Sequence, residues 1–311
     1  MHHQALEERD GINELIDWSR IEALLVDIHN KRRGEQAWPP LMMFKALLRQ
    51  SWYRLSCPAL EKQLARDLLF RRFVDISISE SVPEHSTLWR FRNLLEEEGL
   101  YQPLLDAINQ QLSEQGLLIR SGEVSIIDAS VIKAKNARPT KNKDGTNTED
   151  KDADWNVKQG SDGKRKTPYG YKAHINVEED GFIKTYEVTA GNVHDSQLFE
   201  ELLTGTETEA YADSAYKNQA HDALLKEQGI SNRLLKRGYR NRPLTEQEKR
   251  ENRNNASTRT VVERVFGVLK LHPGMRKSRY LGLTRNKAWI GLISLAHNLK
   301  RGMTLHRCSY S

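Results

Sequence analysis

The chain is poor in cysteine and has no long apolar segment. Its two cysteines, Cys57 and Cys308, are too few for a disulfide framework or a cysteine-based zinc site, so a reducing compartment fits. No apolar run approaches the roughly 18 residues that span a bilayer, and no signal peptide is visible. We therefore expect a cytoplasmic or nucleoid-associated protein with one large domain or two medium ones.

Positive charge is concentrated in the second half of the chain. Residues 1–132 hold 15 Lys and Arg against 20 Asp and Glu, whereas residues 133–311 hold 33 against 22, which gives net charges of −5 and +11. The second half is therefore expected to bind phosphates, although a merely soluble basic surface would show the same excess. Two stretches are rich in Lys and Arg, residues 133–172 and 233–253, and are either phosphate-binding surface or ordinary solvated loops. Their candidate phosphate-binding residues are Lys172, Lys236, Arg237 and Arg240.

The first third of the sequence has the apolar period of helices. Within residues 12–116 we expect five helices: 18–29, a second opened by Pro39-Pro40, a third from Ser56 to about Phe73, 87–97 capped by Ser86, and 102–115. Thr87 to Leu95, with Trp89, Arg90 and Arg92, could be the DNA-reading helix of a helix-turn-helix. Helix packing or dimerisation explains the same residues equally well.

From Glu123 onward the pattern changes to short strands that alternate with helices. The strands are expected at 124–132, 169–177, 182–189, 209–213 and 231–235, and the helices at 195–203, 219–228, 257–271 and 284–301. Residues 133–168 are nearly free of large apolar side chains and are expected to form a mobile basic loop. Within this loop, Trp155 could stack on a base or simply anchor the segment.

Three carboxylates stand in positions that suggest a shared site. Asp128 interrupts an apolar strand, Asp213 ends another strand, and Glu263 lies on an amphipathic helix. A buried unpaired charge is costly, and open α/β sheets place ligands at the carboxyl ends of their strands. Each residue also has an ordinary interpretation: a salt bridge or strand end for Asp128, a helix cap for Asp213, and a solvated helix face for Glu263.

The helix around Glu263 has two distinct faces. At about 100° per residue, Arg259, Glu263 and Lys270 fall within about 40° of one another. The opposite side is apolar and is expected to face the core; its residues are Val262, Val265, Val268 and Leu269.

Together these motifs resemble the DDE transposases of bacterial insertion sequences, and most closely the insertion-sequence-five group. The likeness covers roughly residues 35–300. It rests on Asp128, on Asp213-Ser214-Ala215-Tyr216, on the spacing of Arg259, Glu263 and Lys270, and on the segments 85–92, 169–174 and 192–195. One departure is Ala256, which stands where the wider family often has Tyr. The adjacent pair His194-Asp195 could bind a metal or act as acid and base, but helix capping by Asp195 is the favoured interpretation.

The resemblance implies an RNase H-like fold, a mixed five-stranded sheet flanked by helices, in which the strands of Asp128 and Asp213 are neighbours. It implies a helical N-terminal region over residues 1–120 and a catalytic domain over residues 121–305. Asp128, Asp213 and Glu263 would be catalytic and would hold two Mg²⁺ ions, for which Mn²⁺ can substitute, while Arg259 and Lys270 would hold DNA.

The implied partners are double-stranded DNA, as terminal inverted repeats and as target, and further copies of the chain in a homodimer or larger assembly. Two rival functions stay open: a metal-dependent nuclease without strand transfer, and a non-catalytic DNA-binding repressor.

Overall fold

The chain folds into two compact units. The structure, a computed structural model, describes residues 11–29, 37–117, 123–136, 150–159 and 165–309. Residues 1–119 and 287–311 form a helical unit, and residues 120–286 form a unit built on a β-sheet. In the described part of the chain, no helix has both the length and the apolarity that a bilayer span requires.

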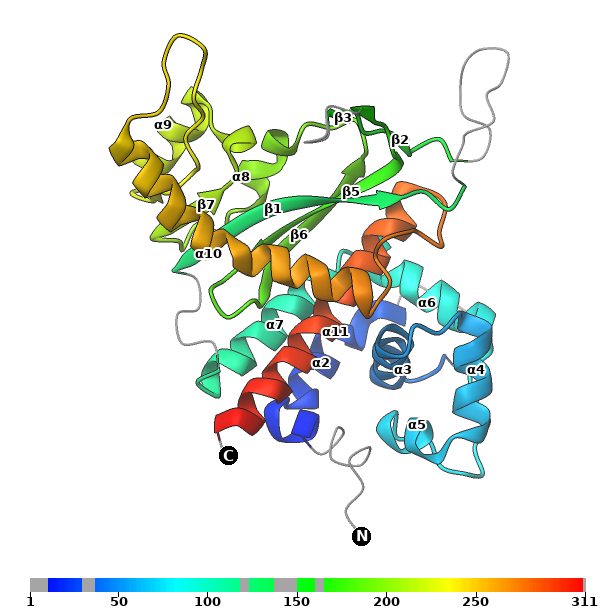
Figure 1. The fold of residues 1–311 in the computed structure, drawn as a ribbon. Helices are drawn as coiled ribbons and strands as arrows, with labels where there is room; N and C mark the ends of the chain where they lie inside the picture. Colours follow the sequence, from blue (N-terminus) through cyan, green and yellow to red (C-terminus); the bar gives the residue numbers. More distant parts are fainter. Residues whose placement is uncertain (1–10, 30–36, 118–122, 137–149, 160–164, 310–311) are drawn as a thin grey trace, which may run out of the picture. The chain divides into compact units, whose positions relative to one another are not determined.

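The helical unit contains the helices that the sequence pattern predicts, with small shifts of their ends (Figure 1). They are α2 (Trp18–Leu25), continued by the 3-10 turn Val26–His29, then α3 (Pro40–Trp52), α4 (Cys57–Arg66), α5 (Leu68–Phe73), α6 (His85–Glu97), α7 (Tyr101–Glu114) and α11 (Leu283–Ser309).

Two of the predicted helix ends in this unit are wrong. The third helix does not run unbroken to Phe73, because Asp67 has extended backbone angles and its carboxylate caps the separate helix α5. Ser86 is not the cap of α6. That helix begins one residue earlier, and the backbone N–H of His85 donates instead to the Glu61 carboxylate, 2.9 Å away on α4. The start of α6 is therefore capped by Glu61, which is distant in sequence, and not by Ser86 as predicted.

Helix α11 is part of the helical unit from residue 287 on, whereas the sequence-based division put residues up to 305 with the sheet. Its contacts explain the assignment: the indole of Trp52 donates to the Ala296 carbonyl at 2.8 Å, and Asn298 donates to Asn109 at 2.7 Å. Most residues of α11 between 288 and 299 are buried, and a helix that is apolar on all sides must be enclosed by others.

The second unit is built on the mixed, RNase H-like sheet that was expected. Five strands lie in the order β6-β5-β1-β7-β8, with β1 antiparallel to β5 and parallel to β7. Their bounds are β1 Val124–Lys133, β5 Tyr169–Val177, β6 Ile183–Ala190, β7 Glu209–Ala212 and β8 Ser231–Asn232. The helices of this unit are α8 (Phe199–Leu202), α9 (Gln219–Glu227) and α10 (Glu246–Leu271).

The segment expected to be a loop contributes strands of its own. Strand β2 (Asp154–Trp155) pairs with the start of β5 and adds a sixth strand to the sheet, while β3 (Lys158–Gln159) pairs with β4 (Arg165–Lys166). Residues 137–149 and 160–164 of that segment lie outside the described residues. Gly170 allows the close approach of backbones here, since a Cβ at this position would lie 2.0 Å from the Ile132 carbonyl oxygen.

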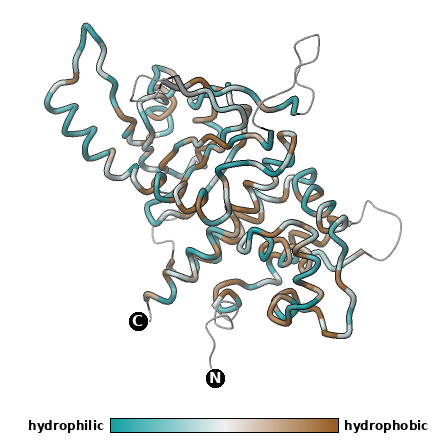
Figure 2. Tube along the Cα trace, turned by 45° about the vertical axis from the view of Figure 1, so that its right-hand side comes forward, coloured by the Kyte–Doolittle hydropathy of each residue, from teal (hydrophilic) through white to brown (hydrophobic). Residues whose placement is uncertain are grey.

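Apolar side chains cover both faces of this sheet. On one side Ile127 packs with α8 and α9 in a cluster that includes Phe199, Tyr216 and Leu225. On the other side lies α10, whose buried residues include Val262 and Phe266. Residues 246–255, the first part of α10, are all hydrophilic (Figure 2). Because successive strand residues face opposite sides, Asp128 points to the same side as Ile126, away from Ile127.

Candidate active site

The pairing of β1 with β7 brings Asp128 and Asp213 together. In this parallel pair Ile126 is opposite Tyr211 and Ile127 is opposite Ala212. The residues that follow Ile127 and Ala212 are the two predicted catalytic aspartates, Asp128 and Asp213. Adjacent strands lie about 4.8 Å apart, which places the two aspartates side by side where β7 ends. The expectation that their strands are neighbours is confirmed.

Helix α10 connects the third carboxylate to this pair through Arg259. The Arg259 guanidinium is 3.2 Å from Asp128 Oδ2 and 3.9 Å from Glu263 Oε1, and the residue is only 9% exposed. The other oxygen of Asp128 accepts a hydrogen bond from the backbone N–H of Ala129 at 2.8 Å. Arg259 thus compensates the charge of Asp128 and orients α10 over β1.

The two faces predicted for α10 need two corrections, at Val268 and at Arg259. Val262, Val265 and Leu269 are buried as expected, but Val268 is 42% exposed, because it lies farther around the helix from the packed side. Arg259 belongs to the buried face, while the Glu263 side chain is 60% exposed. Glu263 therefore lies at the border between the packed and the open surface of the helix.

Asp213 takes part in a capping contact, as its ordinary interpretation predicted. Its carboxylate accepts a hydrogen bond from the Ala215 N–H at 2.8 Å and caps the 3-10 turn Ser214–Tyr216. That turn places the Tyr216 ring in the core against Phe199, with 5.9 Å between ring centres. Burial, reinforced by the charges of Asp128, Asp195 and Asp213, raises the pKa of Tyr216 well above its usual value.

A buried ion pair lies close to the same residues and was not foreseen. Lys172 on β5 is 5% exposed, and its ammonium donates to Asp195 Oδ1 at 2.7 Å and to the Val193 carbonyl at 2.6 Å. Lys172 is therefore an internal residue rather than part of an exposed DNA-tracking surface. The expected capping role belongs to His194, whose ring nitrogen accepts from the Ser196 N–H, and not to Asp195.

The other cations proposed for DNA have different surroundings. Lys236 is half-buried and paired with Glu251 at 2.5 Å, whereas Arg237 and Arg240 are exposed. Lys270 lies 5.6 Å from the centre of the Phe266 ring and is half-buried. Arg237 and Arg240 are thus the most accessible of these cations.

A polar pocket of about 530 Å³ lies between β7, β8 and α10. Lys217, Arg233, Lys236 and Asn254 are among the residues that line it. Trp155, from the other basic stretch, packs against Tyr169 with the rings tilted at 56° and 5.2 Å between ring centres, and it is still 37% exposed.

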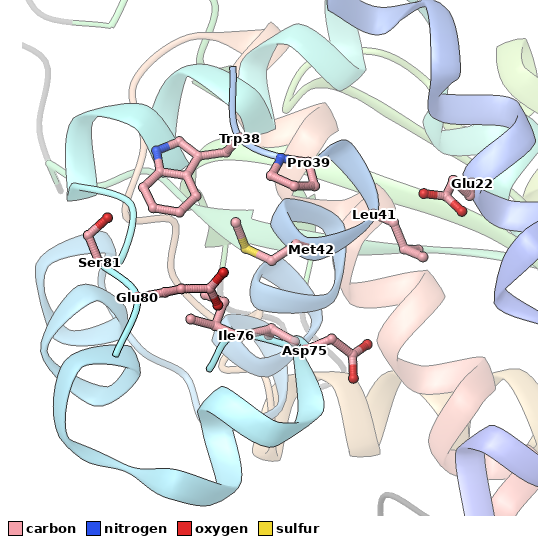
Figure 3. Close-up of a pocket in the computed structure, with 10 residues that line it drawn as sticks. Glu22, Trp38, Pro39, Leu41, Met42, Asp75, Ile76, Glu80 and Ser81 are labelled. Atoms are coloured by element: carbon pink, nitrogen blue, oxygen red, sulfur yellow. The ribbon is translucent and has the colours of Figure 1, made fainter. Parts of the chain in front are cut away.

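The helical unit offers less for DNA than its sequence suggested. On α6, Trp89 and Arg90 are exposed, but Arg92 is completely buried and is not available to read bases. A pocket of about 550 Å³ in this unit has acidic and apolar walls, including Trp38 and the carboxylate of Glu80 (Figure 3). Carboxylates repel phosphates, so this pocket does not suit a DNA backbone.

The chemistry of the three carboxylates suits a hard cation, but their present spacing does not. Oxygen donors are what Mg²⁺ prefers, and Asp128, Asp213 and Glu263 supply only oxygen. Within the described residues, however, no three His, Cys, Asp or Glu side chains are close enough to enclose a metal ion. Arg259 meanwhile lies against Asp128 and Glu263, where it supplies the positive charge that a bound cation would otherwise bring.

An RNase H-like sheet with aspartates on adjacent strands and a glutamate on the following helix defines a class of phosphoryl-transfer enzymes. Residues 119–299 match the family model described as Transposase DDE domain, which covers more than half of the chain. The chain therefore belongs to the DDE transposase family, whose enzymes use divalent metal ions in DNA transposition. Residues 4–94 match a second model, described as Transposase domain (DUF772).

One solved structure shows a weak likeness in fold. The chain is similar to the piggyBac transposase in a synaptic complex with hairpin DNA, with a TM-score of 0.44 and 12% identity. The similarity covers 99% of this chain and 76% of that one. A likeness of this size decides neither mechanism nor partners.

Proposed function

We propose that the protein cuts DNA at the ends of a mobile element of the bacterial insertion-sequence-five group and joins those ends to target DNA. The observation that carries the proposal is the convergence of Asp128 and Asp213 on adjacent strands, with Arg259 and Glu263 on the helix across them. In the first step water attacks the phosphodiester and releases a 3′-hydroxyl. In the second, that hydroxyl attacks a target phosphodiester, so one P–O bond forms as another breaks.

Asp128, Asp213 and Glu263 would together hold the divalent ions. Two bound Mg²⁺ ions, or Mn²⁺ in their place, would activate the attacking oxygen and stabilise the leaving one. Arg259 would have two roles. Its guanidinium neutralises Asp128 until the ions bind, and it can then bind a phosphate oxygen. Lys270, on the same side of α10, would bind the DNA backbone.

Double-stranded DNA would lie over Arg237 and Arg240, which are exposed. Lys236 would contribute only after leaving Glu251. The partners proposed are the terminal inverted repeats, the target duplex, and a second copy of the chain or more, in the bacterial cytoplasm at the nucleoid.

The experiment that tests this function is a strand-transfer assay on pre-cut element ends with Mg²⁺ or Mn²⁺. Asp128→Asn, Asp213→Asn and Glu263→Gln should each abolish cleavage and joining while DNA binding stays nearly intact, because a lost ligand removes activation but not the basic surface. Products that are cut but never joined would establish the nuclease alternative. DNA binding without metal-dependent nicking by the unaltered protein would establish the repressor.

A matched control is available close to the site. Asp222→Asn also removes one carboxylate charge, at a residue that pairs with Lys217 in the same unit. It should leave cleavage within a few-fold of the unaltered protein. Loss of cleavage as severe as that of Asp213→Asn would attribute the effect to net charge and contradict the proposed site.

A further inference from the structure

The end of strand β1 and the segment that follows α10 together carry a group of exposed cations. Lys133, the last residue of β1, forms a parallel bridge with Lys277. Its N–H donates to the Arg276 carbonyl at 3.1 Å, and its carbonyl accepts from the Ser278 N–H at 2.8 Å, so the two segments run side by side (Figure 1). The side chains of Lys133, Lys135, Arg276 and Lys277 are all exposed and form what is called here the β1-end cluster.

The positive charges of the β1-end cluster have no ion-pair partner among the described residues. The local sequence explains this, because no Asp or Glu follows Glu263 in the chain. At the other end of α10, by contrast, part of the positive charge is already paired: Lys236 with Glu251 at 2.5 Å and Lys249 with Glu246 at 2.7 Å. Positive charge that is fixed by the backbone and has no internal partner is available to a polyanion outside the chain.

The carboxylates of the proposed active site lie between the β1-end cluster and the basic segment that precedes α10. Lys133 follows Asp128 by five residues along β1, which is about 17 Å at 3.3 Å per residue. Helix α10 meets β1 at Asp128, where Arg259 contacts it at 3.2 Å, and the segment after the helix pairs with β1 at Lys133. Arg237 and Arg240 precede the same helix and lie at its other end. The unit thus presents a basic surface at each end of α10.

The proposed reaction explains why two such surfaces are needed. Joining requires the element end, which carries the 3′-hydroxyl, and the target, which carries the phosphodiester under attack, to meet at one set of carboxylates. Both are polyanions that repel each other, so each needs positive charge of its own on the protein.

The composition of the two surfaces indicates which DNA each one suits. The polar pocket beside α10 places the amides of Asn254 and Asn255 next to Lys236, and amide side chains can read base edges. Residues 264–282, which include half of the β1-end cluster, contain no Asn or Gln. Cations without neighbouring amides bind phosphates but carry little sequence information. Such a surface suits a duplex that is held without being read.

We propose that the β1-end cluster binds target DNA through its phosphates, while the element end lies at the opposite end of α10. This inference rests on the proposed function. At about 17 Å from Asp128, the cluster would contact phosphates roughly five nucleotides from the bond under attack, since successive phosphates of one strand are about 3.4 Å apart along the helix axis. The cluster therefore holds the target beside the active site and takes no part in the chemistry.

The test replaces the whole cluster in the full-length chain, as Lys133→Gln, Lys135→Gln, Arg276→Gln and Lys277→Gln together. Protein loaded with a pre-cut element end is titrated, without divalent ions, with a fluorescent duplex of unrelated sequence. Affinity should fall at least about tenfold, and the slope of log affinity against log salt should decrease by about 0.9 for each lost phosphate contact. With Mg²⁺, the target concentration that gives half-maximal joining should rise by the same factor, while end cleavage and the maximal joining rate stay unchanged.

A charge-conserving variant at the same four positions is the matched control: Lys133→Arg, Lys135→Arg, Arg276→Lys and Lys277→Arg. It should bind the unrelated duplex within about twofold of the unaltered protein, because phosphate contacts depend on the charge. Neither variant should lower the thermal midpoint, because backbone atoms form the bridge at Lys133. If the charge-conserving variant loses binding as severely as the glutamine variant, the four side chains act through packing and the inference is overturned.

The remaining outcomes separate this inference from the proposed function. A glutamine variant that binds the unrelated duplex as well as the unaltered protein does, and still joins ends, overturns the inference and leaves the proposed function in place. An equal loss of affinity for the element end would put that end on the cluster and overturn the assignment to target DNA. If the unaltered protein joins no ends at all, the proposed function fails, whereas titration of the metal-free protein still decides whether the cluster binds a duplex.

Discussion

Glu178 allows a quantitative prediction about how stability depends on pH. This residue lies in the turn between β5 and β6, is 1% exposed, and accepts a hydrogen bond from the Phe182 N–H at 3.0 Å. Burial, assisted by the nearby negative charges of Asp180 and Glu179, outweighs that bond and raises the pKa of Glu178 from 4.5 to about 7. The folded protein therefore holds a proton that the unfolded chain has already lost.

The sign of the effect follows from that difference. Below pH 4.5 both states are protonated and Glu178 costs nothing. As pH rises from 4.5 to 7 the unfolded chain ionises first, so stability falls, and above pH 7 the full penalty remains. A shift of two to three pKa units corresponds to about 3 kcal/mol. Glu178→Gln keeps the acceptor for Phe182 and removes the charge, so it should stabilise the protein by up to about 3 kcal/mol at pH 8.

The assay is urea unfolding at pH 5 and pH 8. The gain at pH 5 should be less than about 1 kcal/mol, because folded Glu178 is then mostly neutral. Glu179→Gln is the control: this neighbour is exposed, and its effect should stay within about 0.5 kcal/mol at both values. A Glu178→Gln protein that is no more stable at pH 8, or equally stabilised at both values, would refute the reasoning.

Three further predictions concern the same unit. Glu207→Gln should destabilise it by about 3–5 kcal/mol in thermal or urea unfolding, because the buried Lys184 ammonium, 3.1 Å away, would keep its charge without an anionic partner. Replacing Arg237 and Arg240 by Gln should weaken binding to every DNA sequence and reduce the slope of log affinity against log salt by about 0.9 per lost phosphate contact. Val265→Asp should leave little soluble protein on expression, since it places an unpaired charge in the core.

Each of these has a control that isolates its cause. Glu200→Gln removes an exposed carboxylate on α8 and should leave the unfolding midpoint unchanged. Lys226→Gln removes an exposed cation on α9 and should not alter the salt slope; if it does so equally, the arginines are not specific contacts. Val268→Asp lies one turn from Val265 and is 42% exposed, so a folded Val265→Asp protein, or an insoluble Val268→Asp one, would contradict the assignment of faces.

The sheet and the positions of the aspartates could be predicted because local pattern determines them. Tyr169–Val177 alternates strictly, and Val124–Lys133 is mostly apolar, so the charge of Asp128 stands out among its neighbours. The beginning of α10 could not be found in this way. Residues 246–256 are polar on every side, so no apolar stripe reveals a helix there. The signal that was present is Thr245 with Glu248, a complete capping box.

The ion pairs of the site could not be predicted from the sequence, for a different reason. Arg259 and Asp128 are 131 residues apart, and nothing local shows that they meet. Lys172 and Asp195 are separated by 23 residues, and only the packing of β5 against the turn at His194 brings them together. Composition shows how many charges a chain has, whereas the register of the strands decides which of them become partners and which stay exposed.

The continuity of helix α10 has a mechanical consequence. Its 26 residues form one uninterrupted helix, about 39 Å long at 1.5 Å per residue. The exposed Lys249, Arg250 and Arg253 lie near its polar end, and Glu263 lies about three to four turns farther along. Because a helix without a break has a fixed angular phase, the direction in which Glu263 points is set by the helix residues before it. One residue inserted between these ends would swing the carboxylate by about 100° and take it away from the aspartates without touching any residue of the site.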